Sequence, residues 1–397
     1  MIWKAVQGWF TESSLVRRTA EAMLRAVGRR HLARFDRQAP ALCQSRTLLG
    51  LLQQARNTQF GREHDFSRIR TVEDFRRLVP LCTRADLWRQ YWQPVYPRLA
   101  GATWPACGQR DADGRISLSS LQAAHRRALG TAFALATQGR PRKPFLSGVV
   151  LLPDDEGPSS VWERGDLVER LPALVRPYAK VGEDALMERC AHLPVTCLIG
   201  SAERLLPLLE SVKQVRGKRC VREIWPSLSA ILFMRRSPAA TTARLRDEAE
   251  GVPLLELAGC AEGPIAVEDP RHGFMRLLFD HGVYFEFVPA AEADEPRCPR
   301  YGIEEIEIGV PYELALSSPA GLWACRIGRL VCLERRDPPL INFIEPATAV
   351  EKRRPRRTDL MLPTLPEAER HPQSDGNPAA PPESSFHTPW STLADRG

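Results

Sequence analysis

The spacing of apolar residues separates a helical beginning, an alternating middle and a strand-rich end. Early in the chain, apolar positions recur at three- and four-residue intervals, which is typical of helices that bury one face. Short apolar runs then alternate with helical patterns, and beyond Gly263 only strand-like runs remain. The pattern predicts helices over 42–55, 117–138, 165–179, 201–215 and 240–249, and strands over 145–152, 195–199, 228–234, 254–257, 274–279, 283–288, 306–308, 312–316, 322–333 and 340–344.

Two further short helices are marked by their first residues. Thr71 with Asp74, and Thr83 with Asp86, each place a hydroxyl three residues before a carboxylate. That spacing is close to a capping box, so we expect a helix to begin at each threonine.

The order of these elements predicts the fold class. Strands that alternate with helices form mostly parallel sheets, whereas consecutive strands form antiparallel arrangements. We therefore expect an α/β protein with a mostly parallel sheet and a β-rich, barrel-like subdomain. The predicted parts are a basic helical segment at 1–40, an α/β core at 41–262, the β-rich subdomain at 263–345 and a disordered, proline-rich tail at 346–397.

Basic charge is concentrated at the start of the chain. The formal net charge is +7, and residues 1–46 contain nine basic against three acidic side chains. A basic amphipathic helix is expected here, and it either packs on the core or contacts a protein or an anionic surface. No nucleic-acid-binding motif follows, so nucleic acid is not an expected partner. The residues expected on the apolar face are Leu15, Thr19, Ala22, Ala26 and Ala33.

The cellular compartment is predicted from the absence of a membrane-spanning run and of a secretory signal in the sequence. No run approaches the roughly 18 apolar residues of a membrane-spanning helix, and the first residues do not resemble a secretory signal. The ten cysteines include no C-x-x-C pair, so a zinc site is not expected and most should be small buried hydrophobes. We expect a cytoplasmic protein.

Residues 108–117 superficially resemble a phosphate-binding loop before a helix. The spacing is one residue too long, and Arg115 stands where a lysine and hydroxyl pair is required. Asp111 and Asp113 would repel phosphate. A surface turn is therefore the preferred interpretation.

Glu262 is the remaining candidate from the residues alone. It follows the predicted strand 254–257, and open α/β sheets bind ligands at the carboxyl ends of strands. A glutamate there either holds a metal-bound phosphate or caps a turn, and both interpretations stay open.

Eight segments in one order along the chain carry a resemblance to a known family. They are 48–66 (LLGLLQQARNTQFGREHDF), 69–80 (IRTVEDFRRLVP), 124–128 (AHRRA), 224–226 (IWP), 261–267 (AEGPIAV), 284–289 (YFEFVP), 312–314 (YEL) and 321–328 (GLWACRIG). Together they resemble the Gretchen Hagen family of acyl-acid amido synthetases, first known as auxin-responsive proteins. The series covers about 42 to 345.

The resemblance implies an adenylate-forming-enzyme fold, with a large α/β region, a β-barrel subdomain and a small mobile C-terminal domain. It also implies a reaction in which ATP and magnesium convert a carboxylic acid to an acyl-adenylate, which an amino acid's amine then attacks. A carboxylate is a poor electrophile until its oxygen becomes a leaving group, and the site must stabilise the crowded negative charge.

The chain departs from the first two nucleotide-binding motifs of that family. The family's Ser/Thr-Gly loop is replaced by 107–117, which lacks the Gly-Thr-Thr core and contains two aspartates. The second motif, roughly Tyr-small-Ser-Ser-Glu, is replaced by 258–262 (AGCAE). Glu262 remains, but the tyrosine and both hydroxyls are absent.

The third motif, roughly Tyr-Arg-Tyr-x-x-Gly-Asp, becomes WACRIGR at 323–329. Arg329 replaces the aspartate that usually holds the ribose hydroxyls, and a guanidinium donates hydrogen bonds but accepts none. Family members also continue for well over a hundred residues as a lid, whereas 52 residues follow Glu345. The resemblance thus implies a vestigial nucleotide region without a lid, made of Gly259, Glu262, Gly263, Arg326 and Arg329.

Three functions are compatible with this sequence. We favour an adenylation-deficient member that binds a small carboxylic acid or an interaction partner and needs no cofactor. The alternative is an active ligase that joins a carboxylic acid to an amino acid, using ATP and magnesium, with Glu262 as the metal ligand. The third is a re-purposed enzyme in which Glu262 is a base and Arg326 or Arg329 holds an anion.

Overall fold

The computed structural model describes residues 14–96, 98–105, 109–110, 116–117, 119–139, 145, 148–153, 175–178, 190–234, 239–249, 251–260, 263–295 and 298–344. These residues belong to one compact unit, 1–354, and the expected tail at 346–397 lies outside them. The helices are α2 (Ser14–Asp36), α3 (Pro40–Ala55), α4 (Gln59–Glu63), α5 (Val72–Leu78), α6 (Arg84–Leu87), the π-helical turn η1 (Trp88–Trp92), the 3-10 turn η2 (Gln93–Val95), α7 (Ser119–Gly139), α10 (Ala202–Arg216), α11 (Val221–Ile224) and α12 (Ala239–Glu248).

The strands of the main sheet are β1 (Cys82–Thr83), β4 (Val149–Pro153), β5 (Val175–Tyr178), β6 (Val195–Ser201), β7 (Ala230–Met234), β8 (Leu254–Cys260), β9 (Gly263–Asp269), β10 (Phe274–Leu277), β11 (Tyr284–Pro289), β12 (Pro311–Ser318), β13 (Leu322–Arg335) and β14 (Leu340–Ile344). Two short strands, β2 (Gln109–Arg110) and β3 (Ile116–Ser117), pair separately.

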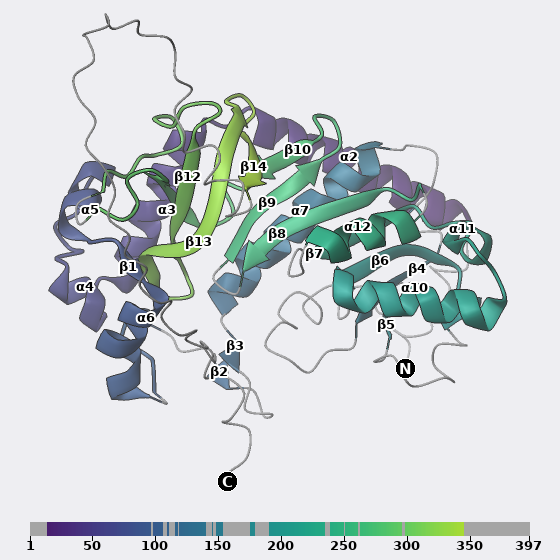
Figure 1. Cartoon of the computed structure of the whole chain (residues 1–397), viewed down its shortest axis with the longest axis horizontal. Coiled ribbons are helices and arrows are strands. Elements are labelled where there is room, and N and C mark those ends of the chain that lie inside the picture. The colour runs from purple at the N-terminus through teal and green to yellow at the C-terminus, as the bar shows by residue number, and fades with distance from the viewer. Residues whose placement is uncertain are drawn as a thin grey trace, which may run out of the picture. The chain divides into compact units, whose positions relative to one another are not determined.

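The main sheet has a parallel half and an antiparallel half that share strand β8 (Figure 1). Its order is β11-β12-β13-β14-β10-β9-β8-β7-β6-β4-β5, with β1 paired to β13. From β8 to β5 every pairing is parallel, and from β8 to β11 every pairing is antiparallel. The expected α/β class is confirmed. The strands expected to be barrel-like pair along an open path that continues into the parallel strands.

Alternate residues of the parallel strands enter two apolar clusters. In β7, Ala230 and Leu232 belong to the cluster that includes α7, whereas Ile231 and Phe233 belong to the cluster around α10. Every residue of β6 and β7 is buried, as expected for strands covered on both faces. Figure 1 shows α10 and α12 on one face of these strands and α7 with α2 on the other.

The basic N-terminal helix forms as α2, but its buried face differs from the expected one. Leu32 and Phe35 are buried, whereas Ala22 and Ala33 are exposed. A Cβ added at Gly28 would lie 3.4 Å from the Cα of Ala134 on α7, so Gly28 permits the close approach of the two helices. The contact with α7, rather than the helix's own pattern, selects the buried face.

Three other expectations are corrected by the fold. The predicted strand at 306–308 is irregular, and within it only Ile308 makes a bridge, to Leu333. Part of the predicted helix at 165–179 is strand β5, and the rest lies outside the described residues. Strand β9 was not expected, because its glycine and proline resemble a turn.

Both predicted capping boxes are confirmed. Thr71 accepts a hydrogen bond from Asp74 N, and Thr83 accepts one from Asp86 N, with the reciprocal carboxylate bond present in each.

Within the described part of the chain, none of the helices combines the length and apolar character that crossing a bilayer requires.

Gln44 on α3 holds the end of the sheet at β11. Its side chain is buried, and its Nε2 donates to the carbonyl oxygens of Phe279 at 2.6 Å and Val283 at 2.9 Å. Its Oε1 accepts from Phe285 N at 2.7 Å. One amide therefore satisfies three buried backbone groups next to and within β11, and so fixes α3 to this strand.

We expect Gln44→Ala to lower the free energy of unfolding by about 3 kcal/mol, because three buried backbone groups lose their partner. Urea unfolding of the purified chain measures this. Gln53→Ala, an exposed glutamine of the same helix, is the matched control and should change stability little. Equal effects of the two substitutions would contradict the assigned role of Gln44.

Candidate functional site

The two predicted glycines lie where β8 turns into β9. Gly259 pairs with Pro264 and Cys260 pairs with Gly263, so the strands stay paired up to the turn. Gly263 has φ +149°, and a Cβ there would lie 2.7 Å from Cγ2 of Val283. Glycine is therefore required for steric reasons. Glu262 lies outside the described residues, so its nucleotide and magnesium roles stay predictions.

Arg326 precedes a bulge in β13 that comprises 327–329, and so includes Arg329, and is centred on Gly328, which has φ +66°. Three residues of β13 stand opposite one residue of β12 at this point. The Nε of Arg326 donates to Oε2 of Glu313 at 2.9 Å, and its Nη2 binds the same oxygen. This hydrogen bonding raises the pKa of Arg326. Arg326 is thus held by a protein carboxylate, whereas no described acidic side chain pairs with Arg329.

Trp323, at the start of the third motif, is a core residue. It is fully buried, and its Nε1 donates to the carbonyl oxygen of Thr103 at 2.9 Å. Its ring centroid lies 4.6 Å from that of Phe66, 6.2 Å from that of Phe60 and 6.1 Å from that of Trp104. Trp323 therefore joins β13 to α4 and to the 101–104 turn.

The structure groups the predicted site residues into two separate pairs. Gly259 and Gly263 lie at the β8–β9 turn, and Arg326 and Arg329 lie on β13. Strands β14 and β10 stand between β13 and β9, so the pairs are separated by three strand spacings, roughly 14 Å along the sheet. At this separation the two pairs do not form one site.

The described residues include two cysteines that face each other but no cluster of metal-binding side chains. Cys82 on β1 lies directly opposite Cys325 on β13, and its Sγ donates to the carbonyl oxygen of Trp323 at 3.1 Å. The hydrogen bond with Cys325, together with burial, raises the pKa of the Cys82 thiol. Eight of the described cysteines are free, and no group of three or more metal-binding side chains occurs in this part of the chain.

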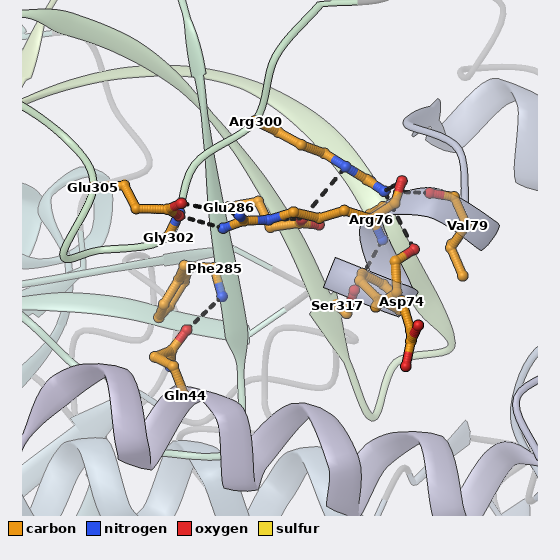
Figure 2. Close-up of polar contacts among 12 residues, drawn as sticks. Gln44, Asp74, Arg76, Val79, Phe285, Glu286, Arg300, Gly302, Glu305 and Ser317 are labelled. Atoms are coloured by element: carbon orange, nitrogen blue, oxygen red, sulfur yellow. Dashed lines mark hydrogen bonds and ion pairs between the residues drawn. The ribbon is translucent and has the colours of Figure 1, made fainter. Parts of the chain in front are cut away.

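A cluster of buried charge surrounds Glu286 on β11 (Figure 2). The side chain of Glu286 is 0% exposed, and its Oε1 lies 3.7 Å from Nε of Arg76 and 3.5 Å from Nε of Arg300. Burial raises the pKa of Glu286, while Arg300 and Arg76 act in the opposite direction without cancelling the effect. This carboxyl is therefore easier to protonate than an exposed one.

The two arginines are fixed by further contacts. Arg76 on α5 donates to both carboxylate oxygens of Glu305, at 3.2 and 2.6 Å. The Nη2 of Arg300 binds the carbonyl oxygens of Arg76 and Val79 at the carboxyl end of α5. A cation at a helix C-terminus is favourable there, because the last carbonyls have no partner within the helix. The cluster thus ties α5 to β11 and to the segment before β12.

Sequence reasoning did not single out this cluster. The segment 284–289 contributed only to the family resemblance, although Glu286 stands in the middle of an apolar strand pattern. The cluster could have been predicted from a charged residue at a strand position whose side chain is expected to be buried, because a buried charge needs partners of opposite charge.

A second buried polar chain connects α2 and α7. Oγ1 of Thr131 lies 2.7 Å from Nε2 of His31 and 2.9 Å from Nε2 of His281, whose Nδ1 lies 2.6 Å from Asp280. Burial, with a contribution from His281, lowers the pKa of His31. Burial alone would raise the pKa of Asp280, but His281 lowers it below the usual value. Thr131 and His281 are buried, whereas His31 and Asp280 are partly exposed, and together these groups hold the helix against the core.

Two segments of the chain match models of known domains. Residues 30–90 match the GH3 family N-terminal domain, and residues 276–345 match the GH3 family central domain. The chain is a divergent relative of the GH3 family. The first GH3 segment contains α3 to α6, and the second contains β11 to β14.

Solved structures of GH3 proteins and of a CoA ligase have a similar fold. A GH3.15 acyl acid amido synthetase has a TM-score of 0.57 at 14% identity, covering 79% of this chain and 69% of that chain. The AtGH3.15 acyl acid amido synthetase in complex with 2,4-DB has a TM-score of 0.56 at 12% identity, covering 77% and 67%. A 2-hydroxyisobutyryl-CoA ligase in complex with 2-HIB-AMP and CoA has a TM-score of 0.51 at 15% identity, covering 74% and 71%. At such identities the likeness shows the adenylate-forming-enzyme fold.

The two GH3 segments meet at Glu286. Arg76 belongs to the first segment, and Glu286 and Arg300 belong to the second. The cluster in Figure 2 is therefore the charged junction between the two matched parts of the chain.

We expect Glu286→Gln to change how stability depends on pH. Because the folded-state pKa of Glu286 lies above 4.5, its contribution is present below that pH and is lost as pH rises through the folded pKa. Glutamine does not ionise, so the unfolding free energy of the variant should rise relative to the original chain over this range. Urea unfolding at a series of pH values measures the difference.

Glu305→Gln is the matched control, because Glu305 binds the same Arg76 but is partly exposed. Hydrogen bonds from Arg76 lower the pKa of Glu305, so its stabilisation is present above 4.5 and is lost as pH falls. The relative stability of this variant should therefore fall as pH rises, opposite to Glu286→Gln. Slopes of the same sign in both variants would contradict the assignment.

Proposed function

We propose that this GH3-family chain does not form acyl-adenylates and acts in the cytoplasm by binding a small carboxylic acid or an interaction partner. The observation that carries the proposal is the ion pair between Arg326 and Glu313. In the third motif, a residue near the expected nucleotide is bound to the protein's own carboxylate. A phosphate or carboxylate ligand would have to displace Glu313 to use this guanidinium.

The surrounding residues support the same proposal. Trp323 occupies the position of the motif's first tyrosine, and it is enclosed by Phe60, Phe66 and Trp104 rather than exposed to a ligand. Arg329 stands at the position of the motif's aspartate, and it has no acceptor for ribose hydroxyls. The described residues of this motif therefore do not fit an ATP site, and we derive no reaction step through ATP or magnesium.

The alternative is an active ligase that uses ATP and magnesium to join a carboxylic acid to an amino acid. It is favoured by the fold shared with proteins named acyl acid amido synthetase and CoA ligase, and by the β8–β9 turn that leads to Glu262. On this alternative, Glu262 would hold magnesium-ATP, and another group would replace the missing ribose acceptor.

Thermal unfolding with and without millimolar magnesium-ATP separates the two functions. A ligand at about 100 times its dissociation constant stabilises a protein by about 2.7 kcal/mol, which is easily detected. We expect no stabilisation by magnesium-ATP and no acid-dependent release of pyrophosphate. A panel of apolar carboxylic acids, tested without nucleotide in the same assay, searches for the proposed ligand.

Arg329→Asp is a matched variant, because it restores the family's acceptor at one position and leaves the other motifs unchanged. We expect it to remain unresponsive to ATP, since Arg326 and Trp323 keep their contacts. Saturable stabilisation of the original chain by magnesium-ATP, followed by acid-dependent pyrophosphate release, would overturn the proposal and establish the alternative.

A further inference from the structure

The outward face of α2 carries a continuous stripe of exposed side chains. Met23, Val27, Arg30 and Arg34 follow one another at intervals of four, three and four residues, so they share one face of α2, and Arg37 follows three residues later, directly after the helix ends. Met23 is 68% exposed and Val27 is 56% exposed. The apolar end of the stripe precedes its basic end, and we call these five residues the α2 stripe.

The basic end of the α2 stripe is hollowed. A hollow of about 470 Å³ is lined by Arg30, Ala33, Arg34, Arg37 and Gln38. Three of the five lining residues are arginines, and the hollow is large enough to admit a phosphate group with its surrounding atoms. Guanidinium groups bind phosphate oxygens through paired hydrogen bonds, so phosphate is the chemistry that fits this hollow.

The α2 stripe has no acidic counterpart in the described part of the chain. Both acidic residues of α2 are engaged elsewhere, since Glu21 binds Arg25 at 2.9 Å and Asp36 binds Arg271 at 3.0 Å. No described carboxylate pairs with Arg30, Arg34 or Arg37. Like charges four residues apart destabilise a helix, so this spacing does not stabilise α2 itself.

We propose that the α2 stripe docks on an anionic phospholipid membrane. The arginines would bind lipid phosphates, and Met23 and Val27 would enter the boundary between headgroups and acyl chains. A free phosphate or an acidic peptide would engage the arginines and leave both apolar side chains in water. The opposite face of α2, with Leu32 and Phe35, packs on the core, so the helix lies along the membrane while the fold stays intact.

Co-sedimentation of the full chain with vesicles tests the proposal. We expect binding to phosphatidylcholine vesicles that contain about 30% phosphatidylserine, weak binding to phosphatidylcholine alone, and loss of binding at high salt. Replacing Arg30, Arg34 and Arg37 together with glutamine should weaken binding on the order of 100-fold, because each basic residue near the surface contributes about tenfold or less. Met23→Ser with Val27→Ser should weaken it about tenfold at unchanged charge.

A second triple variant controls for net charge. Arg56, Lys218 and Arg219 are exposed and lie outside the α2 stripe, and their replacement with glutamine removes the same charge. This control should bind anionic vesicles almost as well as the original chain. All the substituted residues are exposed, and unchanged unfolding temperatures of the variants establish that they fold.

Three results would overturn the proposal. They are equal binding to neutral and anionic vesicles, equal losses in the two triple variants, and stabilisation by inorganic phosphate without vesicle binding, which would indicate a free-anion site. The proposal does not depend on ATP binding, so its failure and the failure of the proposed function are observed in separate experiments.

Discussion

The burial of Glu286 constrains where α5 lies on the antiparallel strands. A carboxyl group in an apolar interior is costly unless cationic partners accompany it, and those partners must also be held in place. Arg76 and Arg300 supply the positive charge from α5 and from the segment before β12. The short helices around α5 therefore have a fixed position on the antiparallel strands. Buried ion pairs contribute little net stability, so the cluster chiefly specifies which arrangement forms.

In the same antiparallel strands, two residues of the third motif make contacts within the protein: Trp323 packs on aromatic rings and Arg326 pairs with Glu313. Strand β13 is long and contacts β1, β12 and β14, so its side chains meet several elements at once. Under the proposed function, Trp323 and Arg326 serve to hold those elements together through packing and an ion pair.

The features that the sequence predicted correctly are those determined by residues close together along the chain. The capping boxes at Thr71 and Thr83 need only four consecutive residues, and the buried strands β6 and β7 are mostly apolar. The buried face of α2 was predicted wrongly, because a contact with α7 decides it and Gly28 has no hydrophobic signal of its own. The predicted site was divided into two pairs because sheet order, which the sequence does not specify, places β14 and β10 between them.

The amide of Gln44 also affects whether another chain can add a strand at the edge of the sheet. Strand β11 ends the path of the main sheet, and exposed edge strands are templates on which other chains can add a strand. Because Gln44 already occupies the N–H of Phe285, and α3 lies against β11, that hydrogen-bonding position is closed to an incoming strand. The residue that anchors α3 thereby also blocks the addition of a strand at this position.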